Sequence, residues 1–172
     1  MSVSPASPLS RPIEVGRLPR GRAEVSVEAS PEECAALARD FGIPEVRDLV
    51  GRFVITGMLS RLTVTGTVEA TVTQVCTVTL EPFESEVREP VEVVYSDAPP
   101  PEEPEEGTVE GAPEPPDPIV NGRIDLGTLT AEFLALGLDP YPRKPGVSFE
   151  VPAAGPETGP FDVLRRLRDG DA

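Results

Sequence analysis

Two short groups of cationic residues, each close to an aromatic residue, are the part of this sequence best suited to binding. Arg143 and Lys144 follow Tyr141, while Arg165, Arg166 and Arg168 follow Phe161. Arginine and lysine bind phosphate and carboxylate groups, and an aromatic residue next to arginine is typical of the dominant contacts in protein interfaces. These residues are therefore candidate contacts for nucleic-acid phosphates or for a protein partner.

Residues that commonly carry out catalysis are scarce. The chain of 172 residues has no histidine and two cysteines, Cys34 and Cys76. The lack of histidine excludes a Ser-His-Asp triad, a Cys-His pair and an HExxH zinc site, and two cysteines cannot complete a four-cysteine zinc site. Acidic pairs such as Glu102 and Glu103 lie where no element is expected to hold them for acid–base catalysis. We therefore predict a protein that is not an enzyme, without metal or cofactor and without a small-molecule substrate.

The formal charge of −15 disfavours unspecific binding of nucleic-acid backbone by the chain as a whole. The charge is uneven, because residues 97–118 hold eight acidic residues, eight prolines and no basic residue. Such a segment cannot bury enough apolar surface to offset its ordering entropy, so we predict a disordered acidic spacer. A solvated spacer is the simpler interpretation, and an acidic interaction segment is the alternative.

No signal peptide or membrane span is expected from the sequence. Residues 1–12 lack the apolar run of a signal peptide, and no window is long and apolar enough to span a membrane. We therefore expect a cytoplasmic protein with no membrane contact, a flexible N-terminus over residues 1–12, and reduced cysteines. A disulfide between Cys34 and Cys76 is disfavoured by that compartment.

A helix is predicted directly before the first cationic group. Asp125 is suited to cap it, and the apolar residues that follow recur at spacings of three and four, placing Leu129, Phe133 and Leu136 in the core. Asp139 and the prolines after it end the helix, so Tyr141, Arg143 and Lys144 should lie at the surface. The plainest interpretation of this window is a core helix with an abrupt end.

The preceding half of the chain predicts one more helix and several strands. Ser30, Pro31 and Glu33 form a capping box with proline at the first helical position, and Gly42 is placed to end that helix. Strands are expected over residues 13–18, 23–29, 53–59, 62–79, 87–95 and 147–151, the fourth with an irregularity at residues 74–76.

These elements predict an α+β fold, an antiparallel β meander or partly open barrel with two main helices packed beside it. We expect a single domain over residues 13–151, interrupted by the acidic spacer. A linker and a short amphipathic segment should then follow over residues 152–172, with Phe161, Leu164 and Leu167 on one side and three arginines on the other.

Four short sequence patterns together resemble a known bacterial family. They are CxVTLEPF at residues 76–83, IDLGxLxxE at 124–132, DPYPRKPG at 139–146 and GPFxVLxxL at 159–167. This combination is similar to the YceD family, the large ribosomal RNA subunit accumulation proteins. The resemblance implies a role in producing or accumulating large-subunit ribosomal RNA, linked to ribosome assembly, and supplies no catalytic residue.

One departure from the family pattern concerns zinc. Many relatives carry a CxxC pair at the first pattern and further cysteines after the late helix, a set that suits zinc. Here the second position of the pair is Thr79, and Pro142, Arg143 and Lys144 stand where the later cysteines would lie. The resemblance therefore implies that structural zinc is lost as a whole. Cys76 is then expected to be buried and to pack like a small apolar residue.

Two functional hypotheses follow. In the first, the protein contacts precursor ribosomal RNA or the pre-ribosomal large subunit, with its arginines on phosphates. In the second, it is an adaptor that recruits a nuclease or a ribosomal protein without touching RNA. The candidate partner-binding residues are Asp125, Tyr141, Arg143, Lys144, Phe161, Arg165, Arg166 and Arg168.

Overall fold

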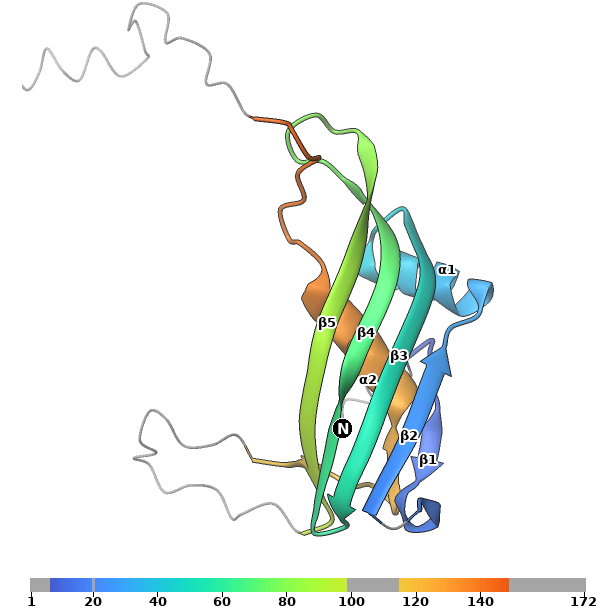
Figure 1. The fold of residues 1–172 in the computed structure, drawn as a ribbon. Coiled ribbons are helices and arrows are strands. Elements are labelled where there is room, and N and C mark those ends of the chain that lie inside the picture. The colour runs from blue at the N-terminus through green and yellow to red at the C-terminus, as the bar shows by residue number, and fades with distance from the viewer. Residues whose placement is uncertain (1–6, 20, 99–114, 149–172) are drawn as a thin grey trace, which may run out of the picture.

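The main sheet has five strands in the order β2-β3-β4-β5-β6 (Figure 1). The computed structural model describes residues 7–19, 21–98 and 115–148. The strands are β2 Gly21–Glu28, β3 Glu45–Met58, β4 Arg61–Val75, β5 Pro82–Ser96 and β6 Asp117–Pro118. The first four pair antiparallel with their sequence neighbours, and β6 joins β5 in parallel. The sheet is open, so the predicted α+β meander is confirmed and the barrel alternative does not apply.

Alternation along β4 separates the two faces of this sheet. Val64, Val68 and Val72 are fully buried, while the threonines between them lie on the opposite face. Successive side chains of a strand point to opposite sides, and β-branched threonine is favoured on a half-exposed surface. β4 is therefore half-buried, with these valines toward the core.

The predicted course of the chain after β4 needs a correction. The fourth strand was expected to continue to residue 79 with an irregularity at residues 74–76, yet β4 pairs regularly with β5 up to Val75 and ends there. A turn then begins at Cys76, whose N–H donates to the carbonyl of Glu81 at 2.9 Å. The register shift lies instead in β3, between Arg47 and Val50, next to the positive φ of 53° at Asp48.

Helix α1, Pro31–Phe41, begins and ends as the sequence indicates. The Ser30 hydroxyl accepts the N–H of Glu33, and the Glu33 carboxylate accepts the N–H of Ser30, which completes the capping box. Gly42 ends the helix with a φ of 66°, a conformation that costs glycine little. The helix buries Cys34 and Leu37 and packs against β3.

Helix α2, Leu126–Gly137, crosses behind β3, β4 and β5 in Figure 1. Leu129 is buried as expected, and Phe133 is partly buried and packs against the core. Leu136 is 73% exposed, so the prediction that it lies in the core is wrong. The buried face instead passes through Thr130 and Leu134. Thr130 escapes a search for apolar spacing because it is polar, and its hydroxyl is satisfied by the carbonyl of Leu126 at 2.6 Å.

A second sheet of two strands lies beside the main sheet. It pairs β1, Pro12–Glu14, with β7, Arg123–Asp125, and follows a turn in which Asn121 and Gly122 both have positive φ. The predicted strand over residues 13–18 is shorter than expected, because residues 15–17 form a 3₁₀ turn. Packing also begins before residue 13, since Leu9 is fully buried.

The last two residues of the spacer predicted over residues 97–118, Asp117 and Pro118, form β6 beside β5. The chain on either side of residues 99–114 therefore lies at neighbouring points of the fold. Tyr95 of β5 pairs with Asp117 of β6, and the N–H of Ile119 donates to the carbonyl of Ser96 at 2.8 Å. Residues 99–114, between these points, and the predicted strand end, linker and amphipathic segment over residues 149–172 lie outside the described residues. Val147 and Ser148 are described and are not in a strand. Neither helix of the described chain is long and apolar enough to cross a membrane.

Candidate interaction surface at the end of helix α2

Two segments more than sixty residues apart in the sequence are joined at one end of the molecule. The turn after β4 lies next to the segment that follows α2, at the top of Figure 1. The N–H and the hydroxyl of Thr77 both donate to the carbonyl of Pro142, at 2.8 and 3.2 Å. The ammonium group of Lys144 lies 3.1 Å from the carboxylate of Glu81. We call the exposed parts of residues 75–81 and 136–144 the junction surface.

Prolines and hydrogen bonds of Asp139 keep the segment after α2 in an extended conformation. The helix ends at Gly137, and the next residue, Leu138, has an extended ψ of 130°. Proline at positions 140 and 142 prevents a further helical turn, because it lacks an N–H and restricts the residue before it. The Asp139 carboxylate accepts the N–H of Tyr141 at 2.8 Å, and its carbonyl accepts the side chain of buried Gln74 at 3.0 Å. The expectation that Tyr141, Arg143 and Lys144 are exposed is met in the structure.

The two segments of the junction surface carry most of the exposed large apolar side chains of the described chain. Of the seven large hydrophobic residues exposed in the described chain, four lie here, namely Val75, Leu80, Leu136 and Tyr141. Tyr141 and Leu136 are each 73% exposed and Leu80 is 77% exposed. Clustered exposed apolar residues beside charged ones are typical of interaction sites, whereas isolated ones need no explanation.

A groove of about 410 Å³ opens beside this patch. Its walls come from the loop after α1, the end of β4 and the segment after α2. They include Phe41, Ile43, Pro44, Val75, Leu138 and Pro140. We call it the α1–α2 groove. The groove brings together residues that the sequence assigned to separate elements with no indication that they meet.

Cys76 lies under the junction surface and is fully buried, as predicted. Its sulfur nevertheless accepts the N–H of Lys144 at 3.4 Å. This hydrogen bond, with further ones from the Thr79 hydroxyl and the N–H groups of Thr79 and Val78, lowers the pKa of the Cys76 thiol to about 6. The prediction that Cys76 is buried is thus confirmed, and its sulfur in addition has hydrogen-bond donors that favour a thiolate.

The groups around Cys76 do not fit a zinc ion. Zinc in proteins takes four ligands from thiolate, imidazole and carboxylate groups. The sulfur here faces the hydroxyl of Thr79 and the N–H of Lys144, which are hydrogen-bond donors. In the described part of the chain there is no group of three or more His, Cys, Asp and Glu side chains that could hold a metal.

Most cations of the described chain are engaged in ion pairs. Eight of its eleven arginine and lysine residues lie within 4 Å of a carboxylate, Lys144 among them. The three without such a partner in the described residues are Arg39, Arg61 and Arg143. These carboxylates reduce the net positive charge that this part of the chain presents to a phosphate.

Asp125 lies at the other end of α2, where internal hydrogen bonds occupy its carboxylate. It accepts the Ser10 hydroxyl at 2.5 Å and the N–H of Arg11 at 2.7 Å, and caps α2 through the N–H groups of Gly127 and Thr128 at 2.9 and 3.0 Å. Burial alone would raise the pKa of Asp125, but these hydrogen bonds outweigh it and hold the pKa below its usual value. Asp125 thus joins the N-terminal segment to the start of α2.

The contact between Arg11 and the start of α2 also requires glycine at position 127. A Cβ atom at Gly127 would lie 2.6 Å from the backbone nitrogen of Arg11, where it does not fit. Arg11 in turn forms an ion pair with Glu33 of α1 at 2.8 Å. Sequence reasoning identified Asp125 as a cap but missed Ser10, Arg11 and Gly127, because nothing in the local sequence shows that the N-terminus returns here.

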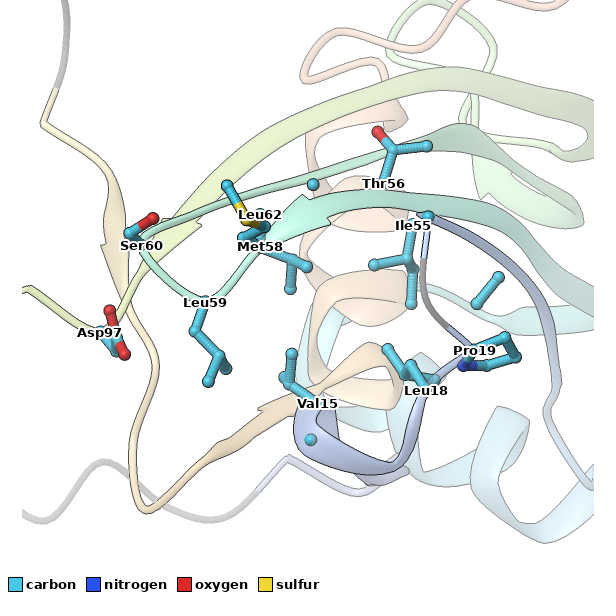
Figure 2. Close-up of a pocket in the computed structure, with 14 residues that line it drawn as sticks. Val15, Leu18, Pro19, Ile55, Thr56, Met58, Leu59, Ser60, Leu62 and Asp97 are labelled. Atoms are coloured by element: carbon cyan, nitrogen blue, oxygen red, sulfur yellow. The ribbon is translucent and has the colours of Figure 1, made fainter.

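A second hollow of about 730 Å³ lies at the opposite end of the sheet (Figure 2). Val15 and Leu18 line one side of it, and Ile55, Met58 and Leu59 line the other. Met58 is 75% exposed. Few polar groups converge on this hollow, so it lacks the arrangement expected of a catalytic pocket.

The structure thus brings Tyr141, Arg143 and Lys144 together with the turn after β4 and places Asp125 elsewhere. The remaining candidate residues, Phe161, Arg165, Arg166 and Arg168, lie outside the described residues. Their part in binding stays a prediction.

Comparison with known proteins identifies the family of this chain. No curated protein and no solved structure matches the chain. The family model described as "Large ribosomal RNA subunit accumulation protein YceD" matches residues 64–163, more than half of the chain. The matched part includes β5, α2 and the whole junction surface. The chain therefore belongs to the YceD family of large ribosomal RNA subunit accumulation proteins.

Proposed function

We propose that this protein is a non-enzymatic factor that supports accumulation and processing of large-subunit ribosomal RNA during ribosome assembly. The family description links the chain to large-subunit ribosomal RNA. The absence of histidine and the few polar groups that converge on the hollow in Figure 2 support a binding role over catalysis. The cytoplasmic location expected from the sequence stays a prediction.

The junction surface is the proposed site of contact with the pre-ribosomal large subunit. The observation that carries this proposal is that Val75, Leu80, Leu136 and Tyr141 are all exposed and belong to the two segments that meet at this end of the molecule. An aromatic residue and an arginine within an apolar patch are the residue types that dominate binding energy in protein interfaces. Asp125 is left out of the contact, because its carboxylate is used within the fold.

Ion pairing of the cations favours the adaptor hypothesis for this surface. Lys144, a candidate phosphate contact, is paired with Glu81, and Arg143 is the one cation of the described junction surface without an ion pair. A protein on the particle, or a nuclease brought to it, fits an apolar patch better than RNA does. Contact with precursor RNA through Arg165, Arg166 and Arg168 is the second candidate, supported by their sequence alone.

The test is co-sedimentation of a tagged protein with the precursor of the large subunit. Tyr141→Ala with Arg143→Glu should leave the free energy of unfolding within about 1 kcal/mol, since both side chains are exposed. The same double variant should leave the particle fraction and raise the level of unprocessed large-subunit RNA.

A matched control lies at the other end of the sheet. Met58→Ala with Arg61→Glu also removes an exposed apolar side chain and a cation without an ion pair, and should sediment as the unmodified protein does. Co-sedimentation that survives RNase supports contact through a protein, and its loss supports contact through RNA. A Tyr141 and Arg143 variant that still sediments with the particle would rule out the junction surface.

A further inference from the structure

We propose that two copies of this chain pair through their β2 strands, antiparallel about a two-fold axis at Val25, so that the two main sheets join into one. Each copy contributes the same residues to such a contact. The inference concerns the isolated protein and does not depend on the proposed function.

The edge of the main sheet formed by β2 has backbone groups free to pair with another strand. β2 is the first strand of the sheet, and β3 is its one pairing partner in the part of the chain that the structure describes (Figure 1). The N–H of Ala29 donates to the carbonyl of Leu49, so odd-numbered residues face β3. The carbonyl of Glu28 faces the other way, toward the guanidinium of Arg11 at 3.5 Å. The backbone groups at the free edge are those of the even-numbered residues, Arg22, Glu24, Ser26 and Glu28.

The opposite edge of the sheet carries features that protect it from such pairing. In the described residues, β6 pairs with the last two residues of β5 and leaves the rest of its outer side unpaired. Pro90 supplies no N–H there, and Glu84, Glu86 and Glu92 are exposed along the same strand. Proline and charged residues on an edge strand prevent pairing with another strand. β2 contains no proline, and its Arg22 offsets one of its two glutamates.

The charges of β2 select one antiparallel register. Pairing about Val25 places Arg22 opposite Glu28 of the second copy at both ends of the contact, and Glu24 opposite Ser26. These pairs join even-numbered residues, so each pair exchanges two backbone hydrogen bonds. An axis at Glu24 would set Glu24 against itself, and an axis at Ser26 would set Glu24 against Glu28. Opposite charges across strands stabilise the pairing and like charges destabilise it, so the register about Val25 is favoured.

The side chains of β2 are available for these contacts. Arg22 and Glu24 form an ion pair at 2.8 Å, but their side chains are 64% and 71% exposed, and such pairs contribute little. Glu28 is exposed and has no ion-pair partner among the described residues. On the other face of the strand, Val25 is partly buried against the core. Pairing would bury the rest of Val25 against Val25 of the second copy, a favourable contact between β-branched residues.

The test is the association state of the full chain, measured by analytical ultracentrifugation at about 0.15 M salt, where repulsion between the two acidic chains is largely screened. The dimer fraction of the unmodified protein should rise with concentration. Arg22→Glu alone and Glu28→Arg alone should each raise the dissociation constant at least about tenfold, because each sets like charges opposite each other twice. An equal mixture of these two variants should dimerise again, since their charges are complementary.

The matched controls change the other edge strand. Arg88→Glu and Glu86→Arg make the same charge changes at exposed residues of β5. Both should leave the dissociation constant unchanged, because β5 takes no part in the proposed contact.

Disulfide cross-linking reads the register directly. Val25 would face its own copy as a non-hydrogen-bonded pair, with Cα atoms about 4.5 Å apart, which suits a disulfide. Val25→Cys should therefore form a covalent dimer on mild oxidation, more efficiently than Glu24→Cys or Ser26→Cys. Cys34 and Cys76 are buried, so the unmodified protein should not cross-link.

Three outcomes would overturn the proposal. An unmodified protein that stays monomeric at every concentration would show that β2 does not pair with its copy. A dimer that the β5 variants weaken as much as the β2 variants do would place the contact elsewhere. Cross-linking that is strongest for Glu24→Cys or Ser26→Cys would show a different register. If Arg22→Glu or Glu28→Arg does not fold, the cross-linking series still decides.

Discussion

At the scale of single residues, Asp125 shows how one carboxylate can join two parts of the chain. It serves as the helix cap expected from the sequence and also accepts hydrogen bonds from Ser10 and Arg11. Its place in the IDLG pattern is therefore explained by folding, together with the close approach at Gly127.

Replacing Asp125 with alanine should lower the free energy of unfolding by about 2–3 kcal/mol. Loss of a cap costs about 1 kcal/mol, and the partly buried donors left without an acceptor add about 1–2 kcal/mol. Denaturant titration measures the change. Asp139→Ala at the other end of α2 removes a carboxylate with one backbone hydrogen bond and is the control, expected to cost less than about 1 kcal/mol. Equal losses for the two variants would contradict the inference that Asp125 holds the N-terminal segment against the start of α2.

Cys76 should make stability depend on pH. The pKa of its thiol is about 6 in the fold and about 9 in the unfolded chain, so the fold favours the thiolate. Its contribution is fully present above about pH 9 and is lost as the pH falls through about 6. The difference in unfolding free energy between the unmodified protein and Cys76→Ala should therefore grow from pH 6 to pH 9.

Cys34 supplies the control for this measurement. Burial raises the pKa of the Cys34 thiol above its usual value of 9.0, so both folded and unfolded chains hold it protonated below about pH 8. Cys34→Ala should lower stability by the same amount at pH 6 and pH 8. A pH-independent effect of Cys76→Ala would show that the sulfur does not act as a thiolate.

At the scale of elements, α2 has an apolar face broader than the one that packs. Leu126, Leu129 and Leu134 are buried, whereas Leu136 points away from the sheet and contributes to the junction surface. The orientation of α2 thus leaves Leu136 exposed in the junction surface, the proposed site of partner contact.

Two leucines of α2 should differ sharply in their contribution to stability. Leu134→Ala should cost about 2–5 kcal/mol, because the side chain is fully buried and its removal leaves a cavity. Leu136→Ala should change the free energy of unfolding by about 0.5 kcal/mol or less, because that side chain is 73% exposed. Thermal or denaturant unfolding of the matched pair decides between this orientation and one in which Leu136 is core.

At the scale of the whole molecule, residues 99–114 connect two strands, β5 and β6, that are paired with each other. The chain on either side of these residues meets through this pairing. We therefore expect that the charge of residues 99–114 can be changed without moving the elements on either side.

Replacing residues 99–114 with a short Gly/Ser linker should leave the free energy of unfolding within about 1 kcal/mol. The ends are neighbours, and the cost of closing a flexible loop changes by only about 0.6 kcal/mol per doubling of length. The melting transition of the shortened chain provides the measurement. A loss of several kcal/mol would mean that the spacer packs against the body, contrary to its composition.

The sequence by itself determined features that depend on neighbouring residues. The capping box of Ser30 and Glu33, the left-handed Gly42 and the alternating valines of β4 all follow from local stereochemistry and periodicity. The family patterns also pointed to the segment that carries Tyr141 and Arg143, because its prolines keep it out of the core. Each of these features depends only on residues close to one another in the sequence, so a short stretch is enough to predict it.

Only the tertiary structure decided which distant residues meet. The contact of Lys144 with Cys76, the ion pair of Lys144 with Glu81 and the partners of Asp125 join residues more than sixty positions apart. The exposure of Leu136 likewise depends on how α2 is rotated against the sheet. Each of these outcomes depends on packing between elements, which no local pattern records. The chemistry of the candidate site therefore became visible only once β4 and α2 were placed side by side.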